Sequence, residues 1–274
     1  IVLLYPANKV SRTQEMQFTT LGNNITALEI DGTFDDCQAI VKTAFQDDDL
    51  RRHTVLSSAN SINIGRLLPQ SIYYFWSAAK IKTEFGVELT ICVPSGNFGN
   101  ICAGLCADLI GAPIDKFVAA VNQNDVIAKF IETGEYEPKP SISTLSNAMD
   151  VGRPSNWERI QILFDNDYSR IAERMWATSI TDLETRSAME RSFENYNYII
   201  DPHTAVGMEG LRRYNERFKQ NGRPALVFST AHPAKFHQVV EETLGNEIDI
   251  PATLKESLER EKQSIMMSNK FDDF

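Results

Sequence analysis

Cysteine and histidine are scarce in this sequence, with four of each among 274 residues. Cys102 and Cys106 are four residues apart and share one face of an expected helix, but no histidine lies near them in sequence to complete a set of metal ligands. None of the cysteines forms a C-x-x-C pair. We therefore predict no metal site and four buried thiols in a reducing cytoplasm: Cys37, Cys92, Cys102 and Cys106.

Basic residues and long apolar runs are also few. The 27 Lys and Arg residues against 37 Asp and Glu residues give a net charge of −10, and no basic patch stands out, which argues against nucleic-acid binding. No apolar run approaches the roughly 18 residues of a membrane-spanning helix. With 42% hydrophobic and 23% charged residues, the composition is typical of a soluble globular protein without a membrane partner.

Apolar runs of strand length alternate with helical patterns, which is typical of a parallel sheet covered by helices on both faces. The expected strands are residues 1–5, 25–30, 53–56, 87–93, 117–121 and 225–228. The expected helices are residues 11–21, 35–45, 67–85, 100–110, 125–134, 157–177, 181–196, 202–220 and 236–244, and the tail 255–274 is expected to form a helix and then a frayed end. We predict a doubly wound α/β fold, in which ligands bind at the carboxyl ends of the strands.

An acidic triplet, Asp47 to Asp49, is expected to be a solvated loop and marks a natural boundary. We predict two domains, residues 1–52 as the C-terminal part of a small α/β domain and residues 53–274 as a large one. The sequence opens directly on an apolar strand pattern at Ile1, without an initiator methionine or a signal peptide. We therefore expect a fragment of a longer protein that lacks an N-terminal segment.

Residues 135–154 form an extended polar segment with several prolines, glycines and serines. It is either a linker or a loop that folds over a site, and the sequence leaves both open.

The segment around which the chain is organised is VPSGNFGN, residues 93–100. It joins an expected strand to an expected helix, so its backbone N–H groups and the positive end of the helix lie close together. Glycine permits the close backbone approach that such a turn uses. The turn is suited to bind a phosphate dianion, with an ordinary connection as the alternative that this segment alone leaves open.

Two other segments with unusual polar content follow expected strands. The first contains Asn60, Ser61 and Arg66, whose amide, hydroxyl and guanidinium groups can surround an oxyanion. The alternative is a loop followed by a solvent-exposed arginine. The second places the Thr230 hydroxyl directly after a strand and close to His232. His232 and His203 are each either structural or part of a cleft.

Together these segments resemble the threonine synthases, pyridoxal-phosphate enzymes of fold type II, the tryptophan synthase β-like family. The resemblance covers nearly the whole chain, and a further match at residues 34–38 is typical of the longer bacterial and fungal subfamily. The motifs that carry it are LSSANSINIGRLLPQ at 56–70, PSGNFGN at 94–100 and STAHPAKF at 229–236. Related dehydratases share the glycine turn but not the Asn-Ser-Ile-Asn stretch.

The resemblance implies the roles of several residues. Backbone amides of one turn bind the phosphate of pyridoxal 5'-phosphate: Gly96, Asn97, Phe98, Gly99 and Asn100. The Thr230 hydroxyl bonds the pyridine nitrogen of the cofactor. The phosphate of the substrate, O-phospho-L-homoserine, binds at Asn60, Ser61 and Arg66.

The Schiff-base lysine of the family stands in a Phe-Lys-Asp setting, upstream of the strand that opens this chain. No lysine here has that setting, and Lys235 is the only one near an expected site. The resemblance thus implies an intact threonine synthase, monomer or homodimer, of which this fragment alone is inactive. The alternatives are another fold type II lyase, such as a threonine dehydratase or a phospholyase-like enzyme, and a non-catalytic protein that binds phosphate ligands.

Overall fold

The computed structural model describes residues 1–220 and 222–274, which form two compact units. The first unit comprises Ile1–Ser57, Ala234–Glu241 and Asn246–Phe274, and the second comprises Ser58–Pro233 and Glu242–Gly245. Among the described residues, no helix has both the length and the apolar character needed to cross a membrane.

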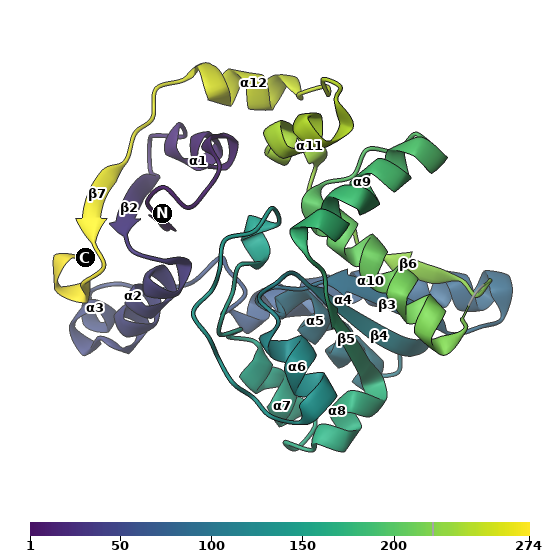
Figure 1. The fold of residues 1–274 in the computed structure, drawn as a ribbon. Helices are drawn as coiled ribbons and strands as arrows, with labels where there is room; N and C mark the ends of the chain where they lie inside the picture. Colours follow the sequence, from purple (N-terminus) through teal and green to yellow (C-terminus); the bar gives the residue numbers. More distant parts are fainter. Residues whose placement is uncertain (221) are drawn as a thin grey trace. The chain divides into compact units, whose positions relative to one another are not determined.

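The first unit contains a parallel sheet of β1 (Val2–Pro6), β2 (Thr26–Asp31) and β7 (Ile265–Ser268), in the order β1-β2-β7 (Figure 1). Its helices are α1 (Arg12–Thr19), α2 (Phe34–Gln46), α3 (Asp48–His53) and α12 (Ala252–Glu259). The 3-10 turn η2 (Pro233–Phe236) and α11 (His237–Leu244) connect the two units, and η3 (Phe271–Asp273) follows β7. Capping boxes at Ser11 and Thr33 start α1 and α2, as their sequences favour.

Residues 47–56 differ from the prediction. The acidic triplet is not a loop, because the Asp47 carboxylate accepts hydrogen bonds from the backbone of Asp49 and Leu50 and caps α3. Basic residues in the last turn of α3 complement its dipole. The strand expected at residues 53–56 is also wrong, since His53 is the last residue of α3 and residues 54–56 lie outside any helix or strand.

The C-terminal tail is not frayed, because β7 pairs in parallel with β2 from Ile265 to Ser268. Lys262 supports this pairing through ion pairs with Glu29 at 2.6 Å and Glu15 at 2.7 Å. Residues 246–274 therefore pack with the N-terminal residues rather than with the second unit. The division at residues 52 and 53 stays a prediction for the whole protein.

The second unit contains a parallel sheet in the order β5-β4-β3-β6 (Figure 1). Its strands are β3 (Leu89–Pro94), β4 (Ile114–Val121), β5 (Met175–Ser179) and β6 (Ala225–Val227). Its helices are α4 (Ile64–Phe85), α5 (Gly99–Leu109), α6 (Val126–Thr133), α7 (Trp157–Leu163), α8 (Tyr168–Arg174), α9 (Asp182–Tyr196) and α10 (Pro202–Phe218), with a 3-10 turn η1 (Asn147–Met149).

Both faces of this sheet are buried, which confirms the doubly wound α/β prediction. Alternate residues of β3 face opposite sides: Ile91 and Val93 belong to a core formed with α4 to α8, whereas Cys92 packs with Val206 and Tyr214 of α10. Strands buried on both faces read as continuous apolar runs, as β3 does.

The single helix expected at residues 157–177 is wrong. Asp165 and Asn166 adopt left-handed backbone conformations, with φ of 56° and 59°, and end α7. Asp167 then caps α8, and β5 begins where α8 ends. Short polar side chains tolerate the left-handed region, so this Asp-Asn-Asp run breaks the helix without glycine or proline.

Gly104 lies where α5 meets α4 and β4. A Cβ atom there would lie 2.3 Å from Cε1 of Tyr74 and 2.7 Å from Cε1 of Phe117. The Tyr74 ring is anchored, because its hydroxyl donates to the side chain of Asn100 at 2.8 Å. We expect Gly104→Ala to lower the free energy of unfolding by about 1–2 kcal/mol, since overpacking outweighs the roughly 1 kcal/mol gain in helix propensity. Urea denaturation measures this, and unchanged stability would show that the rings can yield.

Candidate functional site

Several polar segments of the second unit meet at the carboxyl edge of its sheet. Phe228 N–H donates to the carbonyl of Cys92 at 3.1 Å, so the end of β6 lies beside the end of β3. The Thr204 hydroxyl, in the first turn of α10, lies 3.2 Å from the Ser229 hydroxyl. The N-termini of α5 and α10 thus adjoin the ends of β3 and β6, the place where ligands bind in such sheets.

The turn between β3 and α5 offers a set of backbone donors. Phe98 is the N-cap of α5, with a left-handed φ of 59°, and its side chain makes no capping bond. Within residues 1–220 and 222–274, no protein group accepts a hydrogen bond from the amides of residues 96–100. Unpaired N–H groups at the positive end of a helix suit an anionic oxygen group such as a phosphate.

Neighbouring segments leave no room for a side chain at the two glycines of this turn. A Cβ atom on Gly96 would lie 2.5 Å from the Cα of Met149, and one on Gly99 would lie 2.8 Å from the Cβ of Ser61. Each glycine therefore lets another segment of the second unit approach the turn.

Asn97 joins the turn to both of these segments. Its amide nitrogen donates to the Ser61 hydroxyl at 2.7 Å, and its amide oxygen accepts from the backbone and hydroxyl of Ser155 at 2.6 and 2.9 Å. The Asn156 side chain donates to the backbone carbonyl of Asn97 at 2.9 Å. The side chain of Asn97 is thus engaged by the protein, which leaves its backbone N–H for a ligand.

Asn60 and Ser61 lie between α3 and α4, and Arg66 lies in the first turn of α4, so this segment follows a helix and not the expected strand. The side chain of Asn60 accepts from the backbone of Ile62 at 2.9 Å, and the exposed Arg66 donates to the carbonyl of Ala59. Of these three residues, Ser61 touches the glycine turn. The contact between Ser61 and Asn97 brings two of the predicted polar segments together.

Arg159 of α7 is a residue that the sequence reasoning missed. Its guanidinium donates to the carbonyl of Ser61 at 2.8 Å, to the carbonyl of Ile62, and to the side chain of Asn156 at 2.6 Å. It therefore holds the segment before α4 against the start of α7. No motif marks it, because the backbone carbonyls of Ser61 and Ile62 that it binds are distant in sequence.

Residues 142–156 pack at this edge through Asp150. One carboxylate oxygen accepts from Thr144 at 2.7 Å, Asn122 at 2.9 Å and Asn124 at 3.1 Å, and the other accepts from the Thr144 backbone at 3.0 Å. Burial raises the pKa of Asp150 above its ordinary value, against the lowering effect of these bonds. This part of the 135–154 segment is tied to the sheet edge and lies against the glycine turn at Met149.

A buried histidine provides a second tie. Ala148 N–H can only donate, so Nε2 of His203, 3.2 Å away, is the acceptor. Nδ1 then carries the proton and donates to the Asp201 carboxylate at 2.9 Å, and this carboxylate also accepts from the Thr204 hydroxyl. Of the two interpretations left open for His203, the structure supports the structural one: His203 is a buried residue that holds the segment next to Gly96.

We expect His203→Ala to speed hydrogen exchange of the Ala148 amide about tenfold, because about 1.4 kcal/mol, near the net value of one hydrogen bond, is lost. Mass-spectrometric exchange on peptides that contain residues 145–150 measures this. His237→Ala, which removes a histidine bonded to Thr13 in the other unit, is the control. Equal exchange in both variants would contradict the assigned role.

Thr230 is exposed and follows β6, the strand that pairs with β3. β3 in turn leads into the glycine turn.

Comparison with known proteins agrees with this geometry. A family model described as "Pyridoxal-phosphate dependent enzyme" matches residues 2–230, and one described as "Threonine synthase, C-terminal" matches residues 204–273. The chain belongs to the pyridoxal-phosphate-dependent enzyme family. The chain is 44% identical to the threonine synthases of Serratia marcescens and Escherichia coli K12, over 93% of its own length and 58% of theirs.

Solved structures show the fold type. The E. coli threonine synthase structure matches this pyridoxal-phosphate family member with a TM-score of 0.91 and 42% identity, over 99% of this chain and 62% of that one. The yeast structure matches with a TM-score of 0.82 and 31% identity. The fold is therefore type II, as predicted. The chain spans about 60% of the length of the relatives it matches.

The prediction of four buried cysteines is only partly correct. Three are buried, but Cys106 is half-buried. A hydrogen bond with Cys102 lowers the pKa of the Cys106 thiol to about 7 and raises that of Cys102.

We expect iodoacetamide to alkylate Cys106 half-maximally near pH 7, rather than near the usual pKa of about 8.5, because only the thiolate reacts. Peptide mass spectrometry over a pH series measures the midpoint. Cys102→Ala should move it back to the ordinary value, and a midpoint that ignores this substitution would contradict the pairing.

Proposed function

We propose that the intact protein that contains this chain is a cytoplasmic threonine synthase, which converts O-phospho-L-homoserine and water to L-threonine and phosphate. The observation that carries this proposal is the turn of residues 96–100. Its backbone amides have no acceptor among the described residues, and its Asn97 side chain donates to Ser61 of the Asn-Ser segment. The threonine synthases among the relatives support it.

The site fits pyridoxal 5'-phosphate. The amides of residues 96–100 would hold the cofactor phosphate, and the exposed Thr230 hydroxyl would bond the pyridine nitrogen. When bound, the cofactor supplies an electron sink for carbanions. A hydroxyl at Thr230 leaves the ring nitrogen near neutral, whereas a carboxylate would hold it protonated.

Asn60, Ser61 and Arg66 would bind the phosphate of the substrate. A guanidinium together with amide and hydroxyl groups offers several donors to a phosphate ester and to the phosphate that leaves. Arg159 acts through the backbone of Ser61 and Ile62, so its proposed role is to position this segment.

The Schiff-base lysine is assigned to polypeptide outside residues 1–274. The support is the absence of a Phe-Lys-Asp setting in the sequence, and the chain spans only 58–62% of its relatives' length. The residues described here would thus contribute most of the cofactor and phosphate contacts, and the remaining polypeptide would contribute the lysine.

The proposal is tested with the intact protein, pyridoxal 5'-phosphate and O-phospho-L-homoserine. We expect phosphate and L-threonine to form in equal amounts. Formation of 2-oxobutanoate from L-threonine, with no phosphate release, would indicate a dehydratase instead. Retained cofactor binding with neither reaction would indicate a non-catalytic protein.

A further inference from the structure

A buried carboxylate joins two parts of the candidate site. Asp201 is fully buried, and its Oδ1 caps α10 by accepting from the backbone of His203 at 2.9 Å. The cap itself does not need a charge, because asparagine or serine caps a helix as well as aspartate does. Burying a charged carboxylate is costly, so the place of Asp201 here depends on the further hydrogen bonds that it accepts.

One of these further bonds leads to the glycine turn. Oδ1 of Asp201 also accepts from Nδ1 of His203 at 2.9 Å, which leaves Nε2 to accept from the backbone of Ala148 at 3.2 Å. The next residue is Met149, and a Cβ atom on Gly96 would lie 2.5 Å from its Cα. Asp201 thus fixes, through one imidazole, the segment that supports the turn proposed to bind the cofactor phosphate.

The other further bond leads toward Thr230. The second carboxylate oxygen, Oδ2, accepts from the hydroxyl of Thr204, which lies 3.2 Å from the hydroxyl of Ser229. Ser229 directly precedes Thr230, the residue proposed to bond the ring nitrogen of the cofactor. Thr204 is 4% exposed, so water is largely kept from this path.

We propose that Asp201 is a positioning residue that holds the two ends of the cofactor site at a fixed spacing. Its Oδ2 acts on the ring-nitrogen end through Thr204 and Ser229. Its Oδ1 acts on the phosphate end through His203. The cofactor carries its ring nitrogen and its phosphate on one small molecule, so the two ends of the site have to match that length together. The inference rests on the proposed function, which assigns these ends to pyridoxal 5'-phosphate.

The test compares three variants of the intact protein, and its first readout is hydrogen exchange without ligand. The Phe228 amide donates to the Cys92 carbonyl at 3.1 Å and reports the end of β6, next to Ser229. The Ala148 amide reports the segment beside the glycine turn.

Thr204→Val is expected to speed exchange of Phe228 about tenfold and to leave that of Ala148 unchanged, because valine keeps the shape but lacks the hydroxyl. His203→Ala is expected to do the reverse. Asp201→Asn is expected to speed both. It keeps an oxygen for the cap, but its amide nitrogen cannot accept from Thr204, and its neutral oxygen is a weaker acceptor for His203.

The second readout is NMR of pyridoxine 5'-phosphate, labelled with ¹⁵N in its ring and bound to the intact protein. The ³¹P resonance reports the phosphate end, and the ¹⁵N resonance reports the ring-nitrogen end. Thr204→Val is expected to shift only the ¹⁵N resonance, His203→Ala only the ³¹P resonance, and Asp201→Asn both. A carboxylate that served only as a helix cap would give no such division between the two ends.

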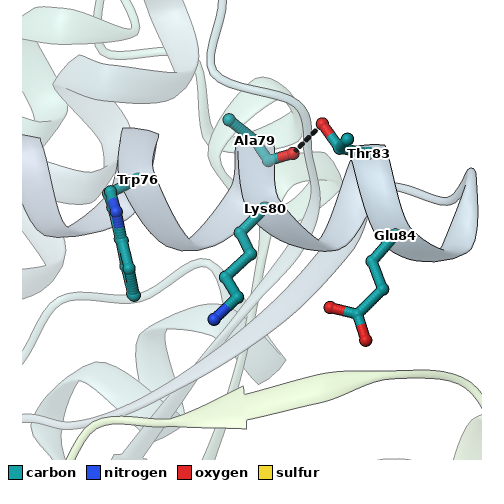
Figure 2. Close-up of a pocket in the computed structure, with 5 residues that line it drawn as sticks. All are labelled: Trp76, Ala79, Lys80, Thr83 and Glu84. Carbon is teal, nitrogen blue, oxygen red and sulfur yellow. Dashed lines mark hydrogen bonds between the residues drawn. The ribbon is translucent and has the colours of Figure 1, made fainter.

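Two controls match the chemistry of these changes. Thr83→Val also removes a threonine hydroxyl, which Figure 2 shows bonded to the Ala79 carbonyl, at 2.8 Å, beside a pocket of about 410 Å³ on α4. α4 ends at Phe85 and β3 begins at Leu89, so Thr83 lies near the amino edge of the sheet, opposite the site. Asp167→Asn changes an exposed aspartate that caps α8. Neither control is expected to change the exchange of either amide or to shift either resonance.

Readouts that change together in all three variants, or that stay unchanged in Asp201→Asn, would overturn the proposal. Thr204→Val and His203→Ala each test one half of it, so the test does not depend on the folding of Asp201→Asn. Failure of the unmodified protein to bind pyridoxine 5'-phosphate would refute the proposed function instead. The exchange pattern without ligand would then still decide whether Asp201 couples the two segments.

Discussion

Gly96→Ala is expected to weaken binding of pyridoxine 5'-phosphate by about 100-fold, or about 2.8 kcal/mol. The added Cβ would lie 2.5 Å from the Met149 Cα and 3.2 Å from the Ala148 carbonyl oxygen, and backbone atoms cannot rotate away. The turn must shift instead, which would displace the amides that are proposed to bind the phosphate. This ligand carries the cofactor's phosphate but no aldehyde, so it cannot form a Schiff base with the lysine. Calorimetric titration of the intact protein therefore measures the affinity of the turn for the phosphate group.

The matched control is Gly86→Asn, at the end of α4. Gly86 has a left-handed φ of 72° and open space around its Cα, and asparagine tolerates this conformation. The affinity of the Gly86→Asn protein for pyridoxine 5'-phosphate should stay within about twofold of that of the unmodified protein, a difference in binding free energy of less than about 0.5 kcal/mol. A folded Gly96→Ala protein with unchanged affinity would show that the phosphate binds elsewhere.

Arg66→Ala is expected to lower kcat/KM for O-phospho-L-homoserine by about 100-fold. A hydrogen bond to a charged group contributes up to about 3 kcal/mol, and tenfold corresponds to about 1.4 kcal/mol. Arg66→Lys should recover part of the loss, because lysine keeps the charge but not the planar set of donors. Initial rates of phosphate release measure all three proteins.

Arg153→Ala is the control for lost surface charge. Arg153 is 73% exposed and lies 4.0 Å from Glu158, so its removal should change kcat/KM by less than about threefold. If Arg66→Ala behaved like this control, the substrate-phosphate site would not lie at Arg66, and a lyase without a phosphate pocket would become the better assignment.

The sequence predicts well those elements whose local signals agree with one another. β3 is a continuous apolar run, and the glycine-asparagine turn then opens α5, so strand, turn and helix follow in the expected order. The capping residues Ser11 and Thr181 likewise start α1 and α9 where expected.

The elements that were missed depend on distant partners. β5 and β7 are short strands whose pairing with β4 and β2 comes from elsewhere in the chain, so local patterns read them as helix and as frayed tail. α3 was missed because the acidic triplet was interpreted as a loop, whereas its first residue, Asp47, caps the helix. In the candidate site, sequence motifs indicated Ser61 and Asn97, but the ties through Arg159, Asp150 and His203 depend on geometry that no spacing encodes.

The pairing of β7 with β2 has a consequence for synthesis on the ribosome. Ser264, just before β7, bonds to Glu29 of β2 across 235 residues of sequence. β2 must therefore wait, with one edge unpaired, until nearly all of the intervening polypeptide has been translated. Contacts so distant in sequence form slowly, and nascent chains with open strand edges are prone to aggregate. We infer that the three-stranded sheet is completed only after translation. Until then, chaperones would have to shield the unpaired edge of β2 from aggregation.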